Sequence, residues 1–410
     1  MGEAHSRRSF LAGALISGAL GAVANRIFVD RAPARKPLPN AVAPVIGLKL
    51  ATGTDNTGTR DQLLRIWKEL HPEIQVQIVR VAGSTKDQLA TFEDSGADVL
   101  NLDLIHIPHF ADGGTGLRTL TQAKNMRYLP SIEKACTVKG SKELWALPFN
   151  ADAGMLFRRV PVRPDPDLAT DLATVMARAE AGRPRFAGQL EWSEADEEAF
   201  VVNVLEQAYA RDRGLLTDDG ETWDFDHTRW NKALTPLRTA LQEKSVVATL
   251  NEDSSDKAFK TGNLPYMRNW PFRLGALDRG ERGGGTERIE VRPIPYGILG
   301  GQFLAITARC PHPVEAERLI RFLTGIPAQR ILALAGFAPS CTAVYNDTQV
   351  TNLVPQLKAV RIAVDNAIPR PVHRNYTDFA SLFAADTKAF LTDGTDLTPD
   401  FTTRMVKALR

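Results

Sequence analysis

The stretch that decides the fold is residues 59–83, TRDQLLRIWKELHPEIQVQIVRVAG. Its first half places Leu63, Trp67 and Leu70 at helical spacing and ends at His71, because a proline follows and disfavours helical backbone in the residue before it. Its second half alternates apolar and polar residues, as a half-buried strand does. The stretch is therefore predicted to be a helix followed directly by a strand.

The segments on either side continue this alternation. Residues 43–53, APVIGLKLATG, are predicted to form a strand that ends in a glycine turn, and residues 85–94 return to helical spacing. Residues 97–107, ADVLNLDLIHI, are again typical of a strand. This order predicts an α/β lobe with a largely parallel sheet, in which ligands bind beyond the carboxyl ends of the strands. The polar residues at or near those ends are Thr54, Asp55, Asn56, Asp103 and His106.

The rest of the chain is predicted to be mostly helical up to about residue 250 and mixed after it. At 410 residues the chain is long for one hydrophobic core, which favours two lobes. Residues 264–272, LPYMRNWPF, read as a turn-like segment between two prolines, and residues 277–291 as a flexible, glycine-rich loop. The expected helices are 168–181, 194–211, 227–244, 313–325, 327–335 and one at the C-terminus, with a glycine-broken strand at 293–306.

Bulk composition excludes some classes of protein. The 50 basic and 48 acidic residues give a net charge of +2, whereas a nucleic-acid-binding protein normally concentrates basic residues on one face. The three cysteines, Cys136, Cys310 and Cys341, are widely spaced and form no zinc or redox motif. We expect them to be buried as small apolar side chains.

The N-terminus is predicted to be an export signal over residues 1–24. Arg7 and Arg8 precede an apolar run that is too short and too rich in Gly and Ala to span a bilayer comfortably, and that ends in a small-x-small pattern at Ala24. The arginine pair resembles a twin-arginine signal, although a general secretory signal with a chance arginine pair would look the same. Since no cysteine follows the run, we expect no lipid anchor, and residues 25–43 are predicted to form an extended linker.

Seven segments, in order, resemble the extracellular solute-binding proteins of ABC sugar importers (family 1), a group that includes the maltose- and trehalose-binding proteins. The resemblance begins near residue 44 and continues to the C-terminus. The segments are IWKELHPEIQVQI (66–78), GADVLNLDLIHIPHFADGGTGLRTL (96–120), LWALPFNADAGMLFRR (144–159), AFKTGNLPYMRNWPF (258–272), GGQFLAI (300–306), EAERLIRFLTGIPAQ (315–329) and AIPRPVHRNY (367–376).

The resemblance implies a two-lobed periplasmic-binding-protein fold (type II-like), with α/β lobes joined by crossover strands and a ligand cleft between them. It places residues 44–150 and about 300–345 in lobe I. It places residues 151–299 and about 346–410 in lobe II. Ligand binding would then close the cleft by a hinge motion.

The same resemblance implies a set of ligand-binding residues. The Trp of its NWP segment, here Trp270, lies against a sugar ring, whose apolar C–H face suits a flat aromatic ring. Arg370, stiffened by flanking prolines, donates hydrogen bonds to sugar hydroxyls. A packing role for Trp270 and a surface role for Arg370 remain open.

Acidic and amide residues are expected to accept hydrogen bonds from the ligand. Asp103 matches a ligand-binding acid of the family, and could instead cap the next helix. Asn150 and Asp152 lie at the first crossover, and the sequence does not decide which one points inward. Asp55 and Asn56 match a family contact region, yet equally suit a turn or a helix cap.

Four further positions complete the predicted ligand-binding set. Glu198, in EEAFVVNVLEQ, resembles a sugar-binding Glu of the family, although an acidic run also suits a solvated helix start. Gly300 and Gly301 permit close backbone approach to the ligand, or form a plain tight turn. His106 stands near a position that is often Trp in relatives. Its spacing from His109 also suits a metal ligand, but no further ligands converge there, and no metal is predicted.

The predicted function is an exported, monomeric sugar-binding protein, periplasmic or associated with the cell surface, that delivers an oligo- or disaccharide to a membrane permease. Two alternatives remain: a binding protein for a polyamine, phosphonate or metal chelate, and an exported glycosidase. The sequence shows no nucleophile motif, metal set or phosphate loop, so we expect no enzyme activity and no cofactor.

Overall fold

The computed structural model describes most of the chain beyond residue 44. The described ranges are 45–55, 57–81, 85–111, 116–121, 127–137, 143–161, 172–178, 182–194, 197–217, 222–262, 264–274 and 287–410. The predicted export signal, the linker and Asn56 lie outside them. Within these ranges the structure contains no helix with the length and apolar character needed to cross a bilayer.

The first lobe is built on a six-stranded mixed sheet. Its strands are β1 (Ile46–Thr52), β2 (Ile74–Arg80), β3 (Val99–Asp103), β4 (Leu117–Arg118), β5 (Leu147–Ala153) and β11 (Leu299–Thr307). β1 runs parallel to β2 and β3, as the sequence predicts, but β11 runs antiparallel to β3, β4 and β5. The sheet is therefore parallel only over β2-β1-β3.

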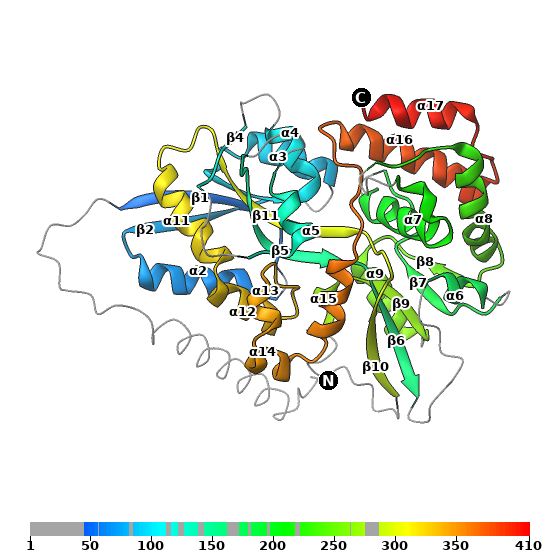
Figure 1. The fold of residues 1–410 in the computed structure, drawn as a ribbon, viewed down its shortest axis with the longest axis horizontal. Helices are drawn as coiled ribbons and strands as arrows, with labels where there is room; N and C mark the ends of the chain where they lie inside the picture. The colour runs from blue at the N-terminus through cyan, green and yellow to red at the C-terminus, as the bar shows by residue number, and fades with distance from the viewer. Residues whose placement is uncertain are drawn as a thin grey trace, which may run out of the picture.

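Helices cover both sides of this sheet, on the left of Figure 1. They are α2 (Thr59–Leu70), α3 (Thr85–Asp94), α4 (Ile107–Ala111), α5 (Pro130–Ala135), α11 (Pro313–Thr324), α12 (Ile326–Leu334), α13 (Thr342–Tyr345) and α14 (Thr348–Leu353). The predicted stripe on α2 is its buried face: Leu63 and Trp67 are 0% and 1% exposed, and both join the core with apolar residues of α11 and α12.

The second lobe has a five-stranded sheet that the sequence analysis missed. Its strands, in the order β10-β6-β9-β7-β8, are β6 (Met155–Pro161), β7 (Phe186–Gly188), β8 (Val246–Ala248), β9 (Tyr266–Asn269) and β10 (Glu287–Pro293). Two sequence predictions were therefore wrong in part. Residues 287–291 pair with β6 as a strand rather than forming a loop, and residues 266–269 form a central strand rather than a turn.

The helices of the second lobe lie mostly on the right of Figure 1. They are α6 (Leu172–Ala177), α7 (Glu198–Arg211), α8 (His227–Gln242), α9 (Glu252–Thr261), α16 (Tyr376–Lys388) and α17 (Pro399–Ala408). Of these, α16 and α17 pack on α7 and α8, respectively. An aromatic cluster attaches the two C-terminal helices to α8, since Trp230 lies 5.2 Å from Phe383 and 6.1 Å from Phe401 between ring centroids.

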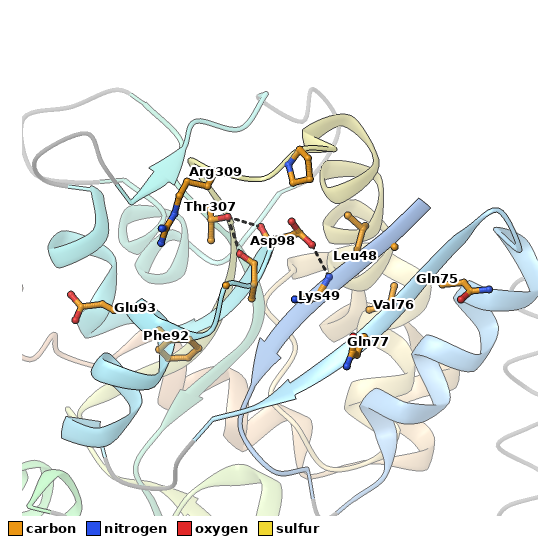
Figure 2. A pocket seen from close by; sticks show the side chains of 14 residues that line it. Leu48, Lys49, Gln75, Val76, Gln77, Phe92, Glu93, Asp98, Thr307 and Arg309 are labelled. Atoms are coloured by element: carbon orange, nitrogen blue, oxygen red, sulfur yellow. Dashed lines mark hydrogen bonds between the residues drawn. The ribbon is translucent and has the colours of Figure 1, made fainter. Parts of the chain in front are cut away.

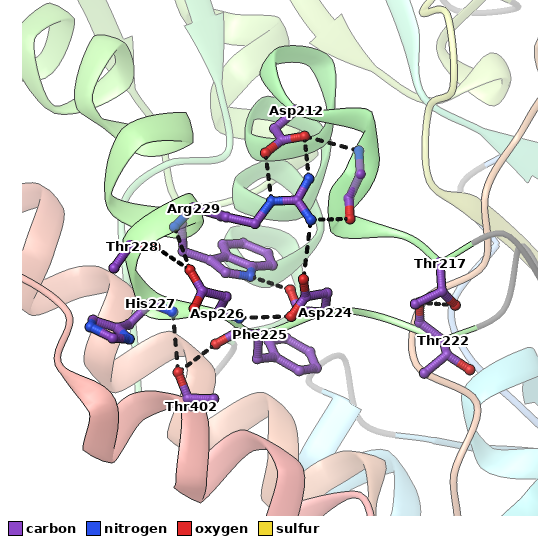
Figure 3. A network of polar contacts seen from close by, with 12 residues as sticks. Asp212, Thr217, Thr222, Asp224, Phe225, Asp226, His227, Thr228, Arg229 and Thr402 are labelled. Atoms are coloured by element: carbon purple, nitrogen blue, oxygen red, sulfur yellow. Dashed lines mark hydrogen bonds and ion pairs between the residues drawn. The ribbon is translucent and has the colours of Figure 1, made fainter.

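A polar network fixes the start of α8 (Figure 3). The guanidinium of Arg229 donates to both carboxylate oxygens of Asp212, at 2.9 and 2.7 Å, and to Asp224 at 3.1 Å. Asp226 caps the helix by accepting from the Arg229 backbone N–H, and Thr402 of α17 accepts from that of His227. These contacts hold α17 against α8, and they lie wholly within the second lobe.

Within the described ranges, three chain segments cross between the lobes. The first passes from β5 through Gly154 into β6, and the second passes from β10 to β11. The third leads from α15 (Leu357–Asp365) to α16 and runs beside the second, because Leu299 N–H donates to the Ile368 carbonyl at 2.7 Å. α14 packs with α12 and α13, whereas α16 packs with α7 and α17. α15 itself contacts both β5 of the first lobe and β10 of the second. We therefore propose that the last change of lobe falls between α14 and α16, later than residue 346.

All three cysteines are free and buried, as expected.

Candidate functional site

Arg370 lies where the two lobes meet. It belongs to the third crossover, between Pro369 and Pro371, and is 2% exposed. Its Nη2 atom lies 2.6 Å from Oδ1 of Asp103 and its Nη1 atom 2.5 Å from Oε1 of Glu198. Burial alone would lower the pKa of Arg370, but the two carboxylates outweigh burial and raise that pKa. Arg370 is therefore a buried cation that joins one acid from each lobe.

Asp103 ends β3 and performs two roles at once. Its side chain accepts a hydrogen bond from the Ile105 backbone N–H at 3.2 Å, which caps the short helix η1 (Leu104–His106). The same Oδ1 atom receives Nη2 of Arg370. The capping role that the sequence left open is thus present together with the polar contact.

Glu198 is the first residue of α7 and faces Arg370. The Tyr376 hydroxyl donates to Glu198, at 2.8 Å from Oε1 and 3.0 Å from Oε2. Burial raises the pKa of Glu198 to about 7, against the lowering effect of the Arg370 charge. Glu198 is thus a buried contact between the lobes rather than part of a solvated helix end.

Asn150 and Asp152 lie on the same face of β5, since they are two residues apart in a strand. Nδ2 of Asn150 donates to Oδ2 of Asp152 at 2.8 Å. The Oδ1 atoms of both residues are buried without a hydrogen-bond partner among the described residues. Burial and the charge of Asp103 raise the pKa of Asp152 to about 8, so this carboxyl group carries a proton over much of the neutral range.

Trp270 follows β9 and is partly buried. Its Nε1–H donates to Oε1 of Glu252 at 2.9 Å, and the Arg268 guanidinium lies 3.9 Å from its ring centroid. A Cβ placed on Gly300 would lie 3.4 Å from the Trp270 ring and 3.2 Å from Cβ of Asp152. Gly300 therefore lies between the indole and the side chain of Asp152.

Gly301 has a structural role in the first sheet. Its φ is +145°, which side chains rarely adopt, and a Cβ there would lie 2.7 Å from the Asn150 carbonyl oxygen. The close approach that this glycine permits is thus between β11 and β5, which positions Asn150.

Asp55 is saturated with local hydrogen bonds. Its carboxylate accepts from the Thr57 N–H and hydroxyl at 2.9 and 2.6 Å, and from the Arg60 N–H at 2.7 Å. Burial raises the pKa of Asp55, but these bonds outweigh it and lower the pKa. The described contacts of Asp55 are therefore those of a turn at the start of α2.

His106 is buried and does not pair with His109. It is 2% exposed, its Nε2 atom has no hydrogen-bond partner within the described chain, and its ring lies 6.1 Å from that of Phe92. Burial lowers its pKa to about 4, so the ring is neutral at ordinary pH. His109 instead contacts Glu93 at 2.9 Å.

Several residues of this region carried no predicted role. Tyr376 and Arg268 lie in the quoted segments AIPRPVHRNY and AFKTGNLPYMRNWPF and could have been found there, whereas Glu252 gave no distinguishing signal. Gln302 of β11 lies between Asp103 of β3 and Asn150 of β5. Its Oε1 atom accepts from Nδ2 of Asn101, also on β3, at 3.0 Å.

A separate pocket of about 640 Å³ lies at the opposite end of the first sheet (Figure 2). Asp98, at one end of β3, lines it, whereas Asp103 is at the other end. Its polar lining includes Lys49, Gln75, Gln77 and Arg309, and none of the predicted ligand-binding residues. It is distinct from the residues around Arg370.

The chain matches a family model described as bacterial extracellular solute-binding protein over residues 62–358. A probable ABC transporter-binding protein of Deinococcus radiodurans is 26% identical over 325 residues, which cover 72% of this chain and 76% of the relative.

Solved structures share the two-lobed fold. Maltose-bound MalE3 of T. maritima has a TM-score of 0.75 and 25% identity, over 89% of this chain and 99% of that one. A solute-binding protein of Thermotoga lettingae with bound α-D-tagatose has a TM-score of 0.72 and 19% identity, over 89% and 98%. The two-lobed α/β fold expected from the sequence is thereby confirmed.

Proposed function

The chain belongs to the bacterial extracellular solute-binding proteins, the non-enzymatic binding components of ABC transporters, and from this premise we propose that its ligand is a neutral sugar, an oligo- or disaccharide. The family implies export, a small ligand and a permease partner. The observation that carries the proposal is a set of buried polar atoms that have no hydrogen-bond partner among the described residues. These are Oδ1 of Asn150, Oδ1 of Asp152, Nε2 of His106 and Nε of Arg370. One of them belongs to Asp152, which Gly300 separates from the Trp270 ring.

A sugar suits these atoms because each hydroxyl both donates and accepts a hydrogen bond. A buried polar atom without a partner costs roughly 1–3 kcal/mol, so a ligand that supplies the partner gains affinity and one that does not is rejected. Asp152, protonated over much of the neutral range, can donate as well as accept. Asn150 accepts through its free oxygen, and Arg370 donates through Nε.

Trp270 supports a sugar rather than a cation. Aromatic sites for cations use the open faces of several rings. Here the Trp270 ring already faces Arg268, and the Tyr376 ring faces Arg370, with 5.9 Å between that guanidinium and the ring centroid. A polyamine is a cation, and it would have to bind rings that each already face a positively charged arginine. A sugar needs only one flat aromatic surface for its C–H face.

We further propose that the ligand enters a cleft between the lobes and that binding closes it. The contacts of Arg370 with Asp103 of one lobe and Glu198 of the other support this proposal, because closure would act on a residue that both lobes already contact. Asp103, Glu198, Asn150, Asp152, His106, Trp270, Gly300 and Arg370 form the proposed ligand-binding set. Gly301 and Asp55 are outside this set: Gly301 allows β11 to pack on Asn150 of β5, and Asp55 fixes the turn before α2. In this proposal a twin-arginine signal exports the chain, which acts as a monomer.

The experiment is a thermal-shift screen of residues 25–410 against mono-, di- and oligosaccharides, spermidine and phosphonates. A ligand at 100 times its dissociation constant should add about 2.7 kcal/mol to the free energy of unfolding. Stabilisation by a saccharide supports the proposal and narrows the substrate. A shift with spermidine or a phosphonate alone would overturn the sugar assignment while leaving the family unchanged.

A further inference from the structure

Arg268 and Glu206 form a buried ion pair in the second lobe. Their side chains are 1% and 0% exposed, and they bond twice: Nε to Oε2 and Nη2 to Oε1, each at 2.8 Å. Burying two charges carries a desolvation cost that their attraction often fails to recover, so such a pair is weak evidence for stability. The residues that contact this ion pair indicate a role other than stability.

Glu206 lies against the crossover segments. Its Oε1 atom also accepts from the Ile298 backbone N–H, in the second crossover, at 2.9 Å. A Cβ placed on Gly154, in the first crossover, would lie only 2.1 Å from the same oxygen. The carboxylate therefore packs against both strands at the point where the chain passes from one lobe to the other.

Arg268 lies against Trp270. Its guanidinium carbon is 3.9 Å from the indole centroid, within the range of a stacked cation–π contact. The indole is held a second time, by the hydrogen bond from Nε1 to Glu252. One bond fixes the edge of the ring, and the guanidinium supports one face.

We propose that Arg268 is a positioning residue that holds the indole of Trp270 in place, and that Glu206 ties this orientation to the crossovers. Bending of the crossover segments then changes the orientation of the indole. A ligand stacked on the indole in turn favours the crossover conformation that matches that orientation. The second half of this inference rests on the proposed function, since it takes Trp270 as a ligand-binding surface. The first half concerns the ligand-free protein alone.

The test removes both charges together, so that neither is left buried alone. Arg268→Met with Glu206→Gln is compared with Arg158→Met and Glu290→Gln, which disrupt another ion pair between strands of the same sheet, β6 and β10. The readout is hydrogen exchange of the indole N–H of Trp270, assigned by loss of its NMR signal in Trp270→Phe. In ligand-free protein we expect at least ten-fold faster exchange in the first double variant and less than two-fold change in the control.

The same variants are measured for affinity toward whichever saccharide stabilises the wild type. We expect at least ten-fold weaker binding in the first pair and unchanged binding in the control. Unchanged indole exchange in a folded Arg268→Met, Glu206→Gln protein would overturn the positioning role. Faster exchange with no saccharide bound by any variant would leave that role standing and count against the proposed function.

If the first double variant fails to fold, Arg268→Lys takes its place. Lysine keeps a charge beside Glu206 but lacks the planar group that stacks on the indole. It should therefore retain the fold and still raise the exchange rate of the Trp270 N–H. A Lys variant with wild-type exchange would overturn the proposal.

Discussion

Asp103 of the first lobe and Glu198 of the second share one guanidinium, that of Arg370, at 2.6 and 2.5 Å. All three were predicted to contact the ligand, and in the structure they contact one another. The terminal nitrogens of Arg370 are engaged with carboxylates, whereas its Nε atom has no hydrogen-bond partner in the described part of the chain. The three residues together form a bridge between the lobes, against which a ligand would bind.

Replacing Arg370 by Ala should weaken ligand binding by about ten-fold or more, on the order of 1.4 kcal/mol. Without the guanidinium, Asp103 and Glu198 face each other with no cation between them. Isothermal titration with the screened saccharide measures the change. Arg238→Ala, which removes an exposed ion pair with Asp396 inside one lobe, is the matched control and should bind normally. Equal affinities in the two variants would contradict the role of the bridge.

Replacing Trp270 by Ala should also weaken binding about ten-fold or more, because the flat surface for the sugar ring is lost. Trp270→Phe retains an aromatic ring but lacks the hydrogen bond to Glu252, and it should lose less affinity than Trp270→Ala. Both affinities are compared by titration. Full affinity in Trp270→Ala would remove Trp270 from the binding surface.

The stability of the ligand-free protein should fall as the pH rises from 6.5 to 8. The pKa of Asp152 is raised from 3.8 to about 8, so the folded state keeps a proton that the unfolded chain has lost. This stabilisation is complete below the unfolded pKa and lost as pH rises through the folded one. Each such group contributes a slope of at most about 1.4 kcal/mol per pH unit. Glu198, whose pKa is raised to about 7, adds to the loss of stability in the lower half of this pH range.

Urea unfolding at pH 6.5, 7, 7.5, 8 and 9 measures this dependence. Asp152→Asn should flatten the slope between pH 7 and 8, and Glu198→Gln the part below pH 7. His106 acts in the opposite direction, but only between its folded value of about 4 and its unfolded value of 6.5, below this window. A slope that is the same in Asp152→Asn and wild type would show that Asp152 is ionised throughout.

Gly301→Ala should destabilise the fold by roughly 1–3 kcal/mol, the cost of a strained backbone conformation. The new Cβ would meet the Asn150 carbonyl oxygen at 2.7 Å, and the φ of +145° disfavours any side chain. Gly53→Ala is the control, since nothing lies within 4 Å of a Cβ there. The two midpoints of urea unfolding are compared. Equal midpoints would mean that β11 and β5 can separate at little cost.

The sequence predicted the first lobe better than the second. Regular alternation of helix and strand marked β1, α2, β2, α3 and β3. The strands β7 and β8 have only three residues each, too few to show a period, and β10 was hidden by the charged, glycine-rich segment before it. In that strand Glu290 pairs with Arg158 of β6, a contact that only the fold reveals.

For the candidate site, the sequence indicated residue types but not their partners. Arg370 and Glu198 are 172 positions apart, and nothing in either segment shows that they bond. For Asp55 the sequence could not decide between two roles, because an aspartate before a helix suits both a ligand contact and a turn. In the structure its hydrogen-bond partners are all close to it in sequence. Glu252 gave no signal because it lies in an ordinary acidic helix start after the Asn251 cap.

The burial of Cys136, Cys310 and Cys341 makes the protein suitable as an optical sensor. Thiolates rather than thiols react with maleimide dyes, and burial raises the pKa of all three groups, that of Cys310 to about 11. The native chain should therefore take up little dye. A cysteine introduced at Val372, which is 48% exposed and two residues from Arg370, would be labelled selectively. A fluorophore there would report ligand binding in real time, without removal of any native cysteine.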